Sequence, residues 1–271
     1  MTRATRFTTA IVLLAAVALT IVPLISIFFA SVQEAGTPVT GLAWPETPHW
    51  ENFATAWSVG GFAKLFLSSG IVVIGVVPLG LILATLGGYA LSRYRFRGSS
   101  VVVAVLLLGL TLPLESIVLP LYYGLRAAGL LDSYWALILP LIGVFMPFGI
   151  FWMRAHFDSL PGELTEAAEM DGAGAFTVFV RILLPTAKPA LATLALLYFM
   201  WAWNQFLLAL VLIQDPSRRT APAGLGQFVT QYGKDIPLLS ASTIIVVIPV
   251  VIVYAIFQRQ LVRGFLQGAV R

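Results

Sequence analysis

The sequence predicts an all-α integral membrane protein that crosses the bilayer six times, and three observations support this. Of the 271 residues, 59% are hydrophobic and only 10% are charged, whereas a soluble domain carries about 25% charged residues. The mean hydropathy is +0.93. The apolar residues also form runs of roughly 20, the length at which a helix crosses about 30 Å of hydrocarbon with all its backbone polar groups satisfied internally.

The apolar runs give the positions of the expected helices in chain order. The six spans are Thr8–Ala30, Phe66–Leu91, Val101–Leu125, Tyr134–Met153, Pro189–Ile213 and Leu238–Phe257. The first begins like a signal peptide, but its apolar run is too long and a clear A-x-A cleavage site is missing, so we expect a transmembrane helix. Together the spans predict one membrane domain over residues 1–271, with no soluble domain attached.

The basic residues predict the orientation, because Lys and Arg concentrate in cytoplasmic loops. With six spans and both termini in the cytoplasm, most of the 16 basic residues fall inside. The cytoplasmic ones are Arg3, Arg6, Arg93, Arg95, Arg97, Arg154, Arg181, Lys188, Arg259, Arg263 and Arg271. The net charge of +4 is therefore explained by topology, and we expect a lipid bilayer and no nucleic acid as partner. The absence of Cys excludes disulfide and thiol chemistry, and no GxxxxGK[ST] motif is present for ATP binding.

The inner loop 154–188 holds the densest acidic cluster of the chain. We expect Asp158 or Ser159 to cap a short helix there, with Pro161 in its first turn. Gly172 is expected to end this helix in a left-handed conformation. A helix of so few turns is not stable alone, so it must dock on another surface.

The residue pattern within this short helix separates two faces. Leu164 and Ala168 share one face at i, i+4, which leaves Glu163 and Glu166 for polar contacts near the positive N-terminal end. Ala167 and Ala168 allow a close approach of another backbone. An ordinary amphipathic surface helix would show much the same pattern, so the spacing of the residues that follow decides between the two interpretations.

Glu166-Ala167-Ala168, three residues, Gly172, nine residues, then Ile182, Leu183, Leu184 and Pro185 closely resembles the EAA signature of ABC-importer permeases, EAA-x3-G-x9-I-x-L-P. Further stretches are similar to the shorter, maltose-type partner of the permease pairs that take up carbohydrates. They are Gly88-Tyr89-Ala90-Leu91-Ser92-Arg93, Pro120-Leu121-Tyr122, Trp203-Asn204-Gln205-Phe206 and the tail from Gln258 through Gly264 to Gly268-Ala269-Val270-Arg271. Ser68-Ser69 departs from the Asn-Ser expected of that family.

The resemblance implies a type I ABC-importer permease fold in a bacterial or archaeal cytoplasmic (inner) membrane. A coupling helix around Leu160–Asp171 would sit in a cleft of an ATPase subunit and move as a lever. Pro185 and Pro189 would break the helix that joins this lever to the fifth span. The residues implied in coupling are Glu163, Leu164, Glu166, Ala167, Ala168, Asp171, Gly172, Ile182, Leu184 and Pro185. The implied partners are a second permease subunit, two ATP-binding subunits that carry ATP and Mg, and an extracellular solute-binding protein. The chain itself would hold no cofactor and would not be an enzyme.

Polar residues inside the expected spans suggest a substrate pathway. Glu115 lies in the third span, where a charge is costly unless it is paired or hydrated. Asn204 and Gln205 interrupt the fifth span, directly after Trp201 and Trp203. Counted as straight helices, Glu115 and Asn204 lie about 21 Å and about 22 Å from the cytoplasmic side, in one layer. A sugar needs hydrogen-bonding groups and flat aromatic faces. The same residues could instead join helices, and the Trp residues could be interfacial anchors.

The leading hypothesis is thus a permease subunit of an ATP-driven, binding-protein-dependent sugar importer that works by alternating access. The cargo could instead be a polyamine, a peptide or another polar solute, since the EAA loop does not encode the substrate. An ATP-independent transporter or channel would leave the EAA spacing unexplained and should act as this chain alone. A membrane scaffold without transport activity would need no polar layer.

Overall fold

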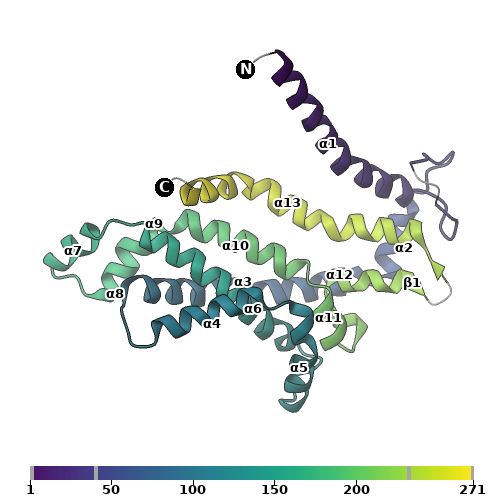
Figure 1. Ribbon diagram of the computed structural model, residues 1–271. Coiled ribbons are helices and arrows are strands. Elements are labelled where there is room, and N and C mark those ends of the chain that lie inside the picture. The colour runs from purple at the N-terminus through teal and green to yellow at the C-terminus, as the bar shows by residue number, and fades with distance from the viewer. Residues whose placement is uncertain (1–2, 40–41, 231–232, 270–271) are drawn as a thin grey trace. The chain divides into compact units, whose positions relative to one another are not determined.

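The computed structural model describes residues 3–39, 42–230 and 233–269, and most of these residues lie in helices (Figure 1). The α-helices are α1 (Arg3–Ser31), α2 (Glu51–Val59), α3 (Phe62–Arg93), α4 (Ser99–Thr111), α5 (Leu114–Ala127), α6 (Trp135–Asp158), α7 (Glu163–Met170), α8 (Ala175–Val178), α9 (Leu184–Thr186), α10 (Lys188–Trp203), α11 (Leu207–Leu212), α12 (Ala221–Gly224) and α13 (Ile236–Ala269). A π-helix covers Phe179–Leu183, and 3-10 turns cover Pro216–Arg218 and Leu225–Phe228. Two short strands, β1 (Val229–Thr230) and β2 (Gly233–Lys234), pair antiparallel. The predicted all-α class is confirmed. Val270 and Arg271, the end of the family-like tail, lie outside the described residues.

Within the described part of the chain, four helices are long and apolar enough to cross a membrane. They are Thr8–Ser31, Phe62–Arg93, Trp135–Asp158 and Ile236–Arg259. Two bent pairs bring the number to six if each is one span: Ser99–Thr111 with Leu114–Ala127, bent by 105°, and Ala175–Thr186 with Lys188–Trp203, bent by 72°. The four unbroken helices correspond to the first, second, fourth and sixth predicted spans.

The chain separates into two compact units, Met1–Ala63 with Gly224–Ile248, and Lys64–Ala223 with Pro249–Arg271. In the first unit, the buried side chain of Asn52 holds the loop that follows α1. Its amide donates hydrogen bonds to the carbonyl oxygens of Ser31 at 3.0 Å and Gln33 at 2.6 Å. Elsewhere in this unit the Phe62 and Phe228 rings are stacked with centroids 6.5 Å apart. A buried amide that binds two backbone carbonyls fixes the path of the loop.

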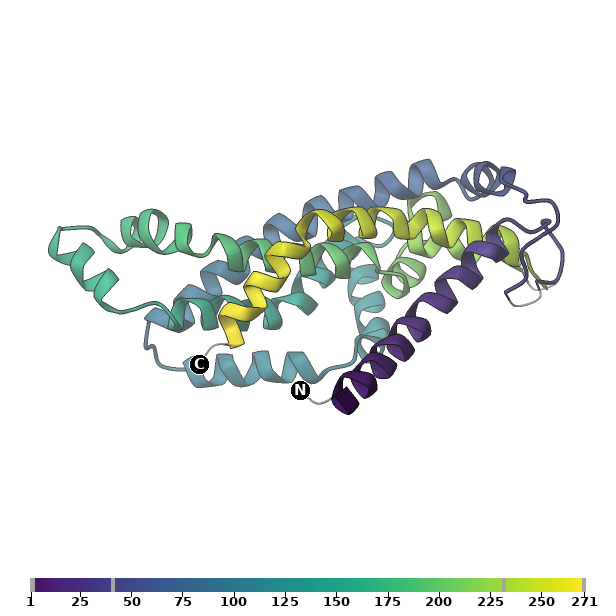
Figure 2. The ribbon, with the colours of Figure 1, turned by 90° about the horizontal axis from the view of Figure 1, so that it is seen from above.

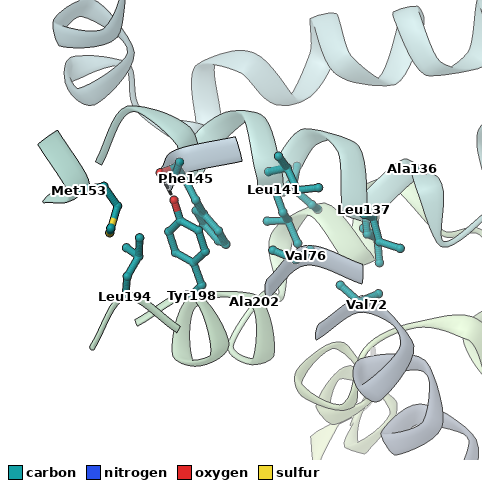
Figure 3. Packing of buried hydrophobic residues seen from close by; sticks show 14 of the residues in the cluster. Val72, Val76, Ala136, Leu137, Leu141, Phe145, Met153, Leu194, Tyr198 and Ala202 are labelled. Carbon is teal, nitrogen blue, oxygen red and sulfur yellow. Dashed lines mark hydrogen bonds between the residues drawn. The ribbon is translucent and has the colours of Figure 1, made fainter. Parts of the chain in front are cut away.

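The second unit has a core built where α3, α6 and α10 meet, and Figure 3 shows its buried side chains. Tyr198 of α10 is completely buried there, and its hydroxyl donates a hydrogen bond to the carbonyl oxygen of Phe145 at 3.0 Å. The ring lies against two glycines, Gly80 of α3 and Gly149 of α6. Small residues let membrane helices approach closely enough for one large side chain to touch both neighbours.

Two of the expected spans are interrupted in the structure. The third is broken at Leu112 and Pro113, which are both extended, because proline disfavours the helical conformation of the residue before it. Figure 2 shows α4 and α5 diverging at this point. The fifth ends as a helix at Trp203, and a new helix starts at Leu207. By contrast, α6 continues through Pro140 and Pro147.

Candidate coupling site and substrate pathway

The expected coupling helix is present as α7, and the α7–α8 segment projects beyond the ends of α6 and α10 (Figure 1). The predicted start of α7 is wrong. Asp158 is the last residue of α6, and Ser159 caps that helix, with its hydroxyl bonded back to the carbonyl oxygen of His156 at 2.7 Å. Gly162 is the N-cap of α7, so Pro161 precedes the helix instead of lying in its first turn. The side chain of Asp158 is engaged elsewhere, by Ser92 and Arg154.

The predicted end of α7 is confirmed, because Gly172 has a φ of 80°. The Gly172 N–H donates to the carbonyl oxygen of Glu169 at 3.0 Å, and the Ala173 N–H donates to that of Ala168 at 2.9 Å. This pair of bonds is the Schellman arrangement, which requires a left-handed residue at the position of Gly172. A glycine is therefore needed for backbone conformation at the point where the chain reverses away from α7.

One face of α7 packs on the protein and the other is open. Ala168 is buried, whereas Glu163, Leu164, Glu166 and Ala167 are exposed. Beside the helix lies a surface hollow of about 440 Å³ lined by Pro161, Glu163, Leu164, Ala167, Ala168, Asp171 and Ile182. Six of the residues predicted for coupling thus line one hollow, with carboxylates beside small and apolar groups.

The return from α7 to the membrane is irregular. After α8, the chain forms the π-helix Phe179–Leu183 and the single turn α9, which contains Leu184 and Pro185. It then bends by 72° at Ala187 before α10, which has Pro189 in its first turn. The predicted break between the lever and the fifth span is confirmed. A π-turn next to such a break is a feature often found at functional sites.

Two apolar side chains near the tip of this segment were missed by the sequence prediction. Met170 is 88% exposed and Phe176 is 79% exposed, on either side of Gly172. Large apolar groups this exposed often mark an interaction surface. The signal was available in the sequence, since both residues interrupt an otherwise polar and small-residue segment.

In the expected substrate pathway, Asn204 and Gln205 have different environments. Asn204 is exposed, and its side-chain amide donates to the carbonyl oxygen of Met200 at 2.9 Å. Gln205 is 8% exposed; its side-chain oxygen accepts a bond from the Leu208 N–H at 3.3 Å, and its carbonyl oxygen accepts one from the Thr220 hydroxyl at 2.7 Å. Gln205 thus holds the start of α11, while Asn204 keeps a surface that other groups can reach.

The two tryptophans contact different helices. Trp201 is 36% exposed, with its ring centroid 5.3 Å from that of Phe145 and 5.1 Å from that of Phe148 on α6. Trp203 is buried and packs edge-to-face on Phe66 of α3, with centroids 5.4 Å apart. Trp201 therefore has a face open to its surroundings, and Trp203 joins α10 to α3.

Glu115 is exposed in the first turn of α5. There the helix dipole favours a carboxylate, which is a local reason for its position. The straight-helix count that placed Glu115 level with Asn204 is wrong in its premise, because α4 and α5 are bent by 105° just before Glu115. Among the described residues, no group of three or more His, Cys, Asp or Glu side chains could hold a metal.

A polar clasp, which we define as Asp132 with residues 212–218, was also missed by the sequence prediction. The Asp132 carboxylate accepts hydrogen bonds from the N–H groups of Gln214 at 3.1 Å and Asp215 at 3.0 Å, and its own N–H donates to Leu212. Asp132 has a φ of 59°, a rare conformation for a residue with a side chain. Hydrogen bonds from the Ser217 N–H and hydroxyl lower the pKa of the neighbouring Asp215.

Ser68 and Ser69, which stand where the resemblance leads us to expect Asn-Ser, both have a clear structural role. Both are buried on α3. The Ser69 hydroxyl oxygen accepts a bond from the N–H of Ala221 at 2.8 Å, at the start of α12, and the Ser68 hydroxyl lies 3.1 Å from that of Tyr134. The two serines therefore join α3 to the segment after the clasp and to the start of α6.

Comparisons with known proteins find related permease proteins. The diacetylchitobiose uptake system permease protein of Streptomyces coelicolor is 34% identical over 254 residues, covering 93% of this chain and 84% of its own. The trehalose transport system permease protein of Mycobacterium tuberculosis is also 34% identical over 254 residues, covering 93% and 92%. Both are permease proteins of a similar length.

A solved structure also supports the fold. A chain of a bacterial ABC transporter involved in the import of the acidic polysaccharide alginate matches with a TM-score of 0.80 at 25% identity, covering 96% of this chain and 98% of that one. The predicted type I ABC-importer permease fold is confirmed. The family model of binding-protein-dependent transport system inner membrane components matches residues 76–267, which also confirms the inner-membrane localisation. The chain belongs to the family of binding-protein-dependent transport system inner membrane components.

Proposed function

We propose that this chain is a permease subunit of an ATP-driven importer of sugars, supplied by an extracellular solute-binding protein. The observation that carries the proposal is α7, a short exposed helix with the EAA residues, a left-handed Gly172 and a bend before α10. The sugar assignment is supported by relatives named for diacetylchitobiose and trehalose transport. A solved neighbour of the same fold belongs to an alginate transporter in complex with its periplasmic protein.

In this proposal the energy comes from other subunits. Two ATP-binding subunits carry ATP and Mg, and a second permease subunit completes the transport path. The exposed face of α7, with Glu163, Glu166 and Ala167, docks in a cleft of one ATP-binding subunit, and both termini lie in the cytoplasm. Closure of the ATPase pair favours the outward-facing state through the differential affinity of ATP for the two states. This chain binds and moves but carries out no covalent chemistry.

The substrate pathway is proposed to include Glu115, Trp201, Trp203, Asn204 and Gln205. Within this set, Glu115 and Asn204 are accessible for hydrogen bonding, and Trp201 is accessible for stacking on a sugar ring. Gln205 and Trp203 contribute by holding the break between α10 and α11 in position. Aromatic faces with a few convergent polar groups suit a hydroxyl-rich ligand.

The ligand preference of the cognate solute-binding protein tests the cargo. Binding of di- or oligosaccharides, measured by calorimetry, would support a sugar, whereas preference for a polyamine or a peptide would contradict it. The orientation is tested by single cysteines in this cysteine-free chain. Cysteines at the exposed Ser58 and Ser217 should react with an impermeant thiol reagent in intact cells, and one at Ser100 should not. Labelling of the Ser100 position from outside would contradict the proposed orientation.

A further inference from the structure

The cytoplasmic end of α3 contacts the coupling segment at both of its ends. Tyr89 packs edge-to-face on Phe157, near the end of α6, with ring centroids 5.7 Å apart. On another side, its ring lies 4.6 Å from that of Phe179, the first residue of the π-helix. Phe157 and Phe179 are themselves 6.4 Å apart. One side chain of α3 therefore touches the chain where it enters the α7–α8 segment and where it leaves it.

Hydrogen bonds reinforce the contact at the entrance. The Ser92 hydroxyl donates to the Asp158 carboxylate at 2.6 Å, and Arg154 lies 3.4 Å from the other carboxylate oxygen. The Arg93 guanidinium donates to the carbonyl oxygen of Phe157 at 3.3 Å. The last turn of α3 is thus bonded to both of the final residues of α6.

Gly88 lets α3 and α6 approach closely enough for these contacts. A Cβ on Gly88 would lie 2.7 Å from the Cβ of Met153 and 2.8 Å from the backbone nitrogen of Arg154, which is closer than real contacts allow. The blocking atoms belong to the α6 backbone or are bonded directly to it, so they cannot rotate aside as the end of a flexible side chain can. The stretch Gly88 to Arg93 therefore packs closely against the end of α6, from which the chain enters the coupling segment.

We infer that Tyr89 is a positioning residue that transmits the displacement of α7 to the membrane helix α3, with Ser92 fixing the entrance to the segment. This inference rests on the proposed function, since it requires an ATPase subunit that moves α7. A segment held at one end only would swing about that attachment. Tyr89 contacts both ends of the segment. A displacement of α7 therefore moves the Tyr89 ring, and with it α3.

The test uses the complete transporter in liposomes, with its binding protein and Mg-ATP. The readout is the stimulation of ATP hydrolysis by the binding protein, which measures transmission across the permease. In Tyr89→Ala, basal hydrolysis should persist while the stimulation falls roughly fivefold or more, since one aromatic pair corresponds to as much as about tenfold in an equilibrium constant. Tyr89→Phe keeps the ring and should restore the stimulation. Tyr89→Leu fills the volume without an aromatic face and replaces Tyr89→Ala if that variant fails to assemble.

Tyr94→Ala is the matched control, because Tyr94 directly follows α3, is half-exposed and packs on Tyr89. It should keep close to normal stimulation. Normal stimulation in both Tyr89→Ala and Tyr89→Leu would overturn the inference, as would an equal loss in Tyr89→Phe. A wild-type complex that is stimulated but accumulates no saccharide would contradict the proposed cargo and leave this test of transmission intact.

Discussion

Tyr198 occupies the space that a side chain at position 149 would need, so that a Cβ on Gly149 would overlap the Tyr198 hydroxyl. The same hydroxyl donates to the Phe145 carbonyl oxygen, one turn away on α6 (Figure 3). The missing side chain and the buried hydroxyl together set how closely α6 and α10 approach. Because α6 precedes the α7–α8 segment and α10 follows it, this contact fixes the spacing of the two helices that the segment joins.

Gly149→Ala should destabilise the complex, because the added methyl group displaces a buried ring. Overpacking of this kind costs about 1–3 kcal/mol. Tyr198→Phe should cost less, about 0.5–1.5 kcal/mol for the lost hydrogen bond. Thermal unfolding of the purified complex measures both. Gly143→Ala is the control, because a Cβ there meets nothing within 4 Å. Equal stability of the Gly149→Ala and Gly143→Ala complexes would contradict the packing described for Tyr198.

Asp132 should show separate contributions from its side chain and its backbone. Asp132→Asn keeps an acceptor oxygen and tolerates a positive φ, so its stability should stay close to normal. Asp132→Gly keeps the backbone conformation but loses two hydrogen bonds, each worth about 0.5–1.5 kcal/mol. Asp132→Ala loses the bonds and adds a backbone penalty of about 1–2 kcal/mol. Unfolding temperatures should therefore fall in the order Asn, Gly, Ala, and an Asn variant as unstable as the Ala variant would refute the clasp.

The end of α7 should not tolerate a side chain with a branched Cβ. Gly172→Val forces a valine into a left-handed conformation, at a cost of about 1–2 kcal/mol, and should disturb the orientation of α7. Glu166→Lys places the opposite charge on the exposed face. Both variants should insert normally and lose solute uptake. Gly174→Ala is the control, since Gly174 has an extended backbone and open space around its Cβ position. Normal uptake by the Gly172 and Glu166 variants would argue against α7 as the coupling site.

Asn204 and Gln205 should differ when each is replaced by Ala. Asn204→Ala should weaken uptake at limiting solute by roughly two- to tenfold, the equivalent of one hydrogen bond, with unchanged thermal stability. Gln205→Ala should lower stability, because the side chain holds the start of α11. Glu115→Gln tests the charge at the start of α5 in the same assay. If Asn204→Ala and Glu115→Gln both leave uptake unchanged, neither of these two side chains contacts the solute.

The sequence predicted the helices whose apolar runs are uninterrupted, such as α1, α3, α6 and α13. It predicted the left-handed Gly172 as well, because a glycine at the end of a short helix is a local signal for a left-handed C-terminal residue. It did not predict the bend at Pro113, since prolines within membrane helices are often tolerated, as Pro140 and Pro147 are in α6. Composition alone does not separate a tolerated proline from one that ends a helix.

The residues that sequence reasoning missed are those defined by long-range contacts. Asp132 binds groups 82 and 83 residues further along the chain, and Ser69 binds one 152 residues away. Tyr89 lies in a stretch that resembles the carbohydrate permeases, but its contacts with Phe157 and Phe179 depend on the packing of three separate segments. No local pattern in the sequence encodes such pairings, whereas Met170 and Phe176 could have been found as apolar residues in a polar loop.

The most direct test of the account is ATP-dependent accumulation of a labelled saccharide in liposomes that contain this chain, the second permease subunit and the two ATP-binding subunits. Mg-ATP is enclosed inside and the loaded binding protein is added outside. The account predicts accumulation above the external concentration that requires ATP hydrolysis and is lost in Glu166→Lys with the complex intact. Accumulation that continues without ATP, or that this chain supports in the absence of the ATP-binding subunits, would contradict it.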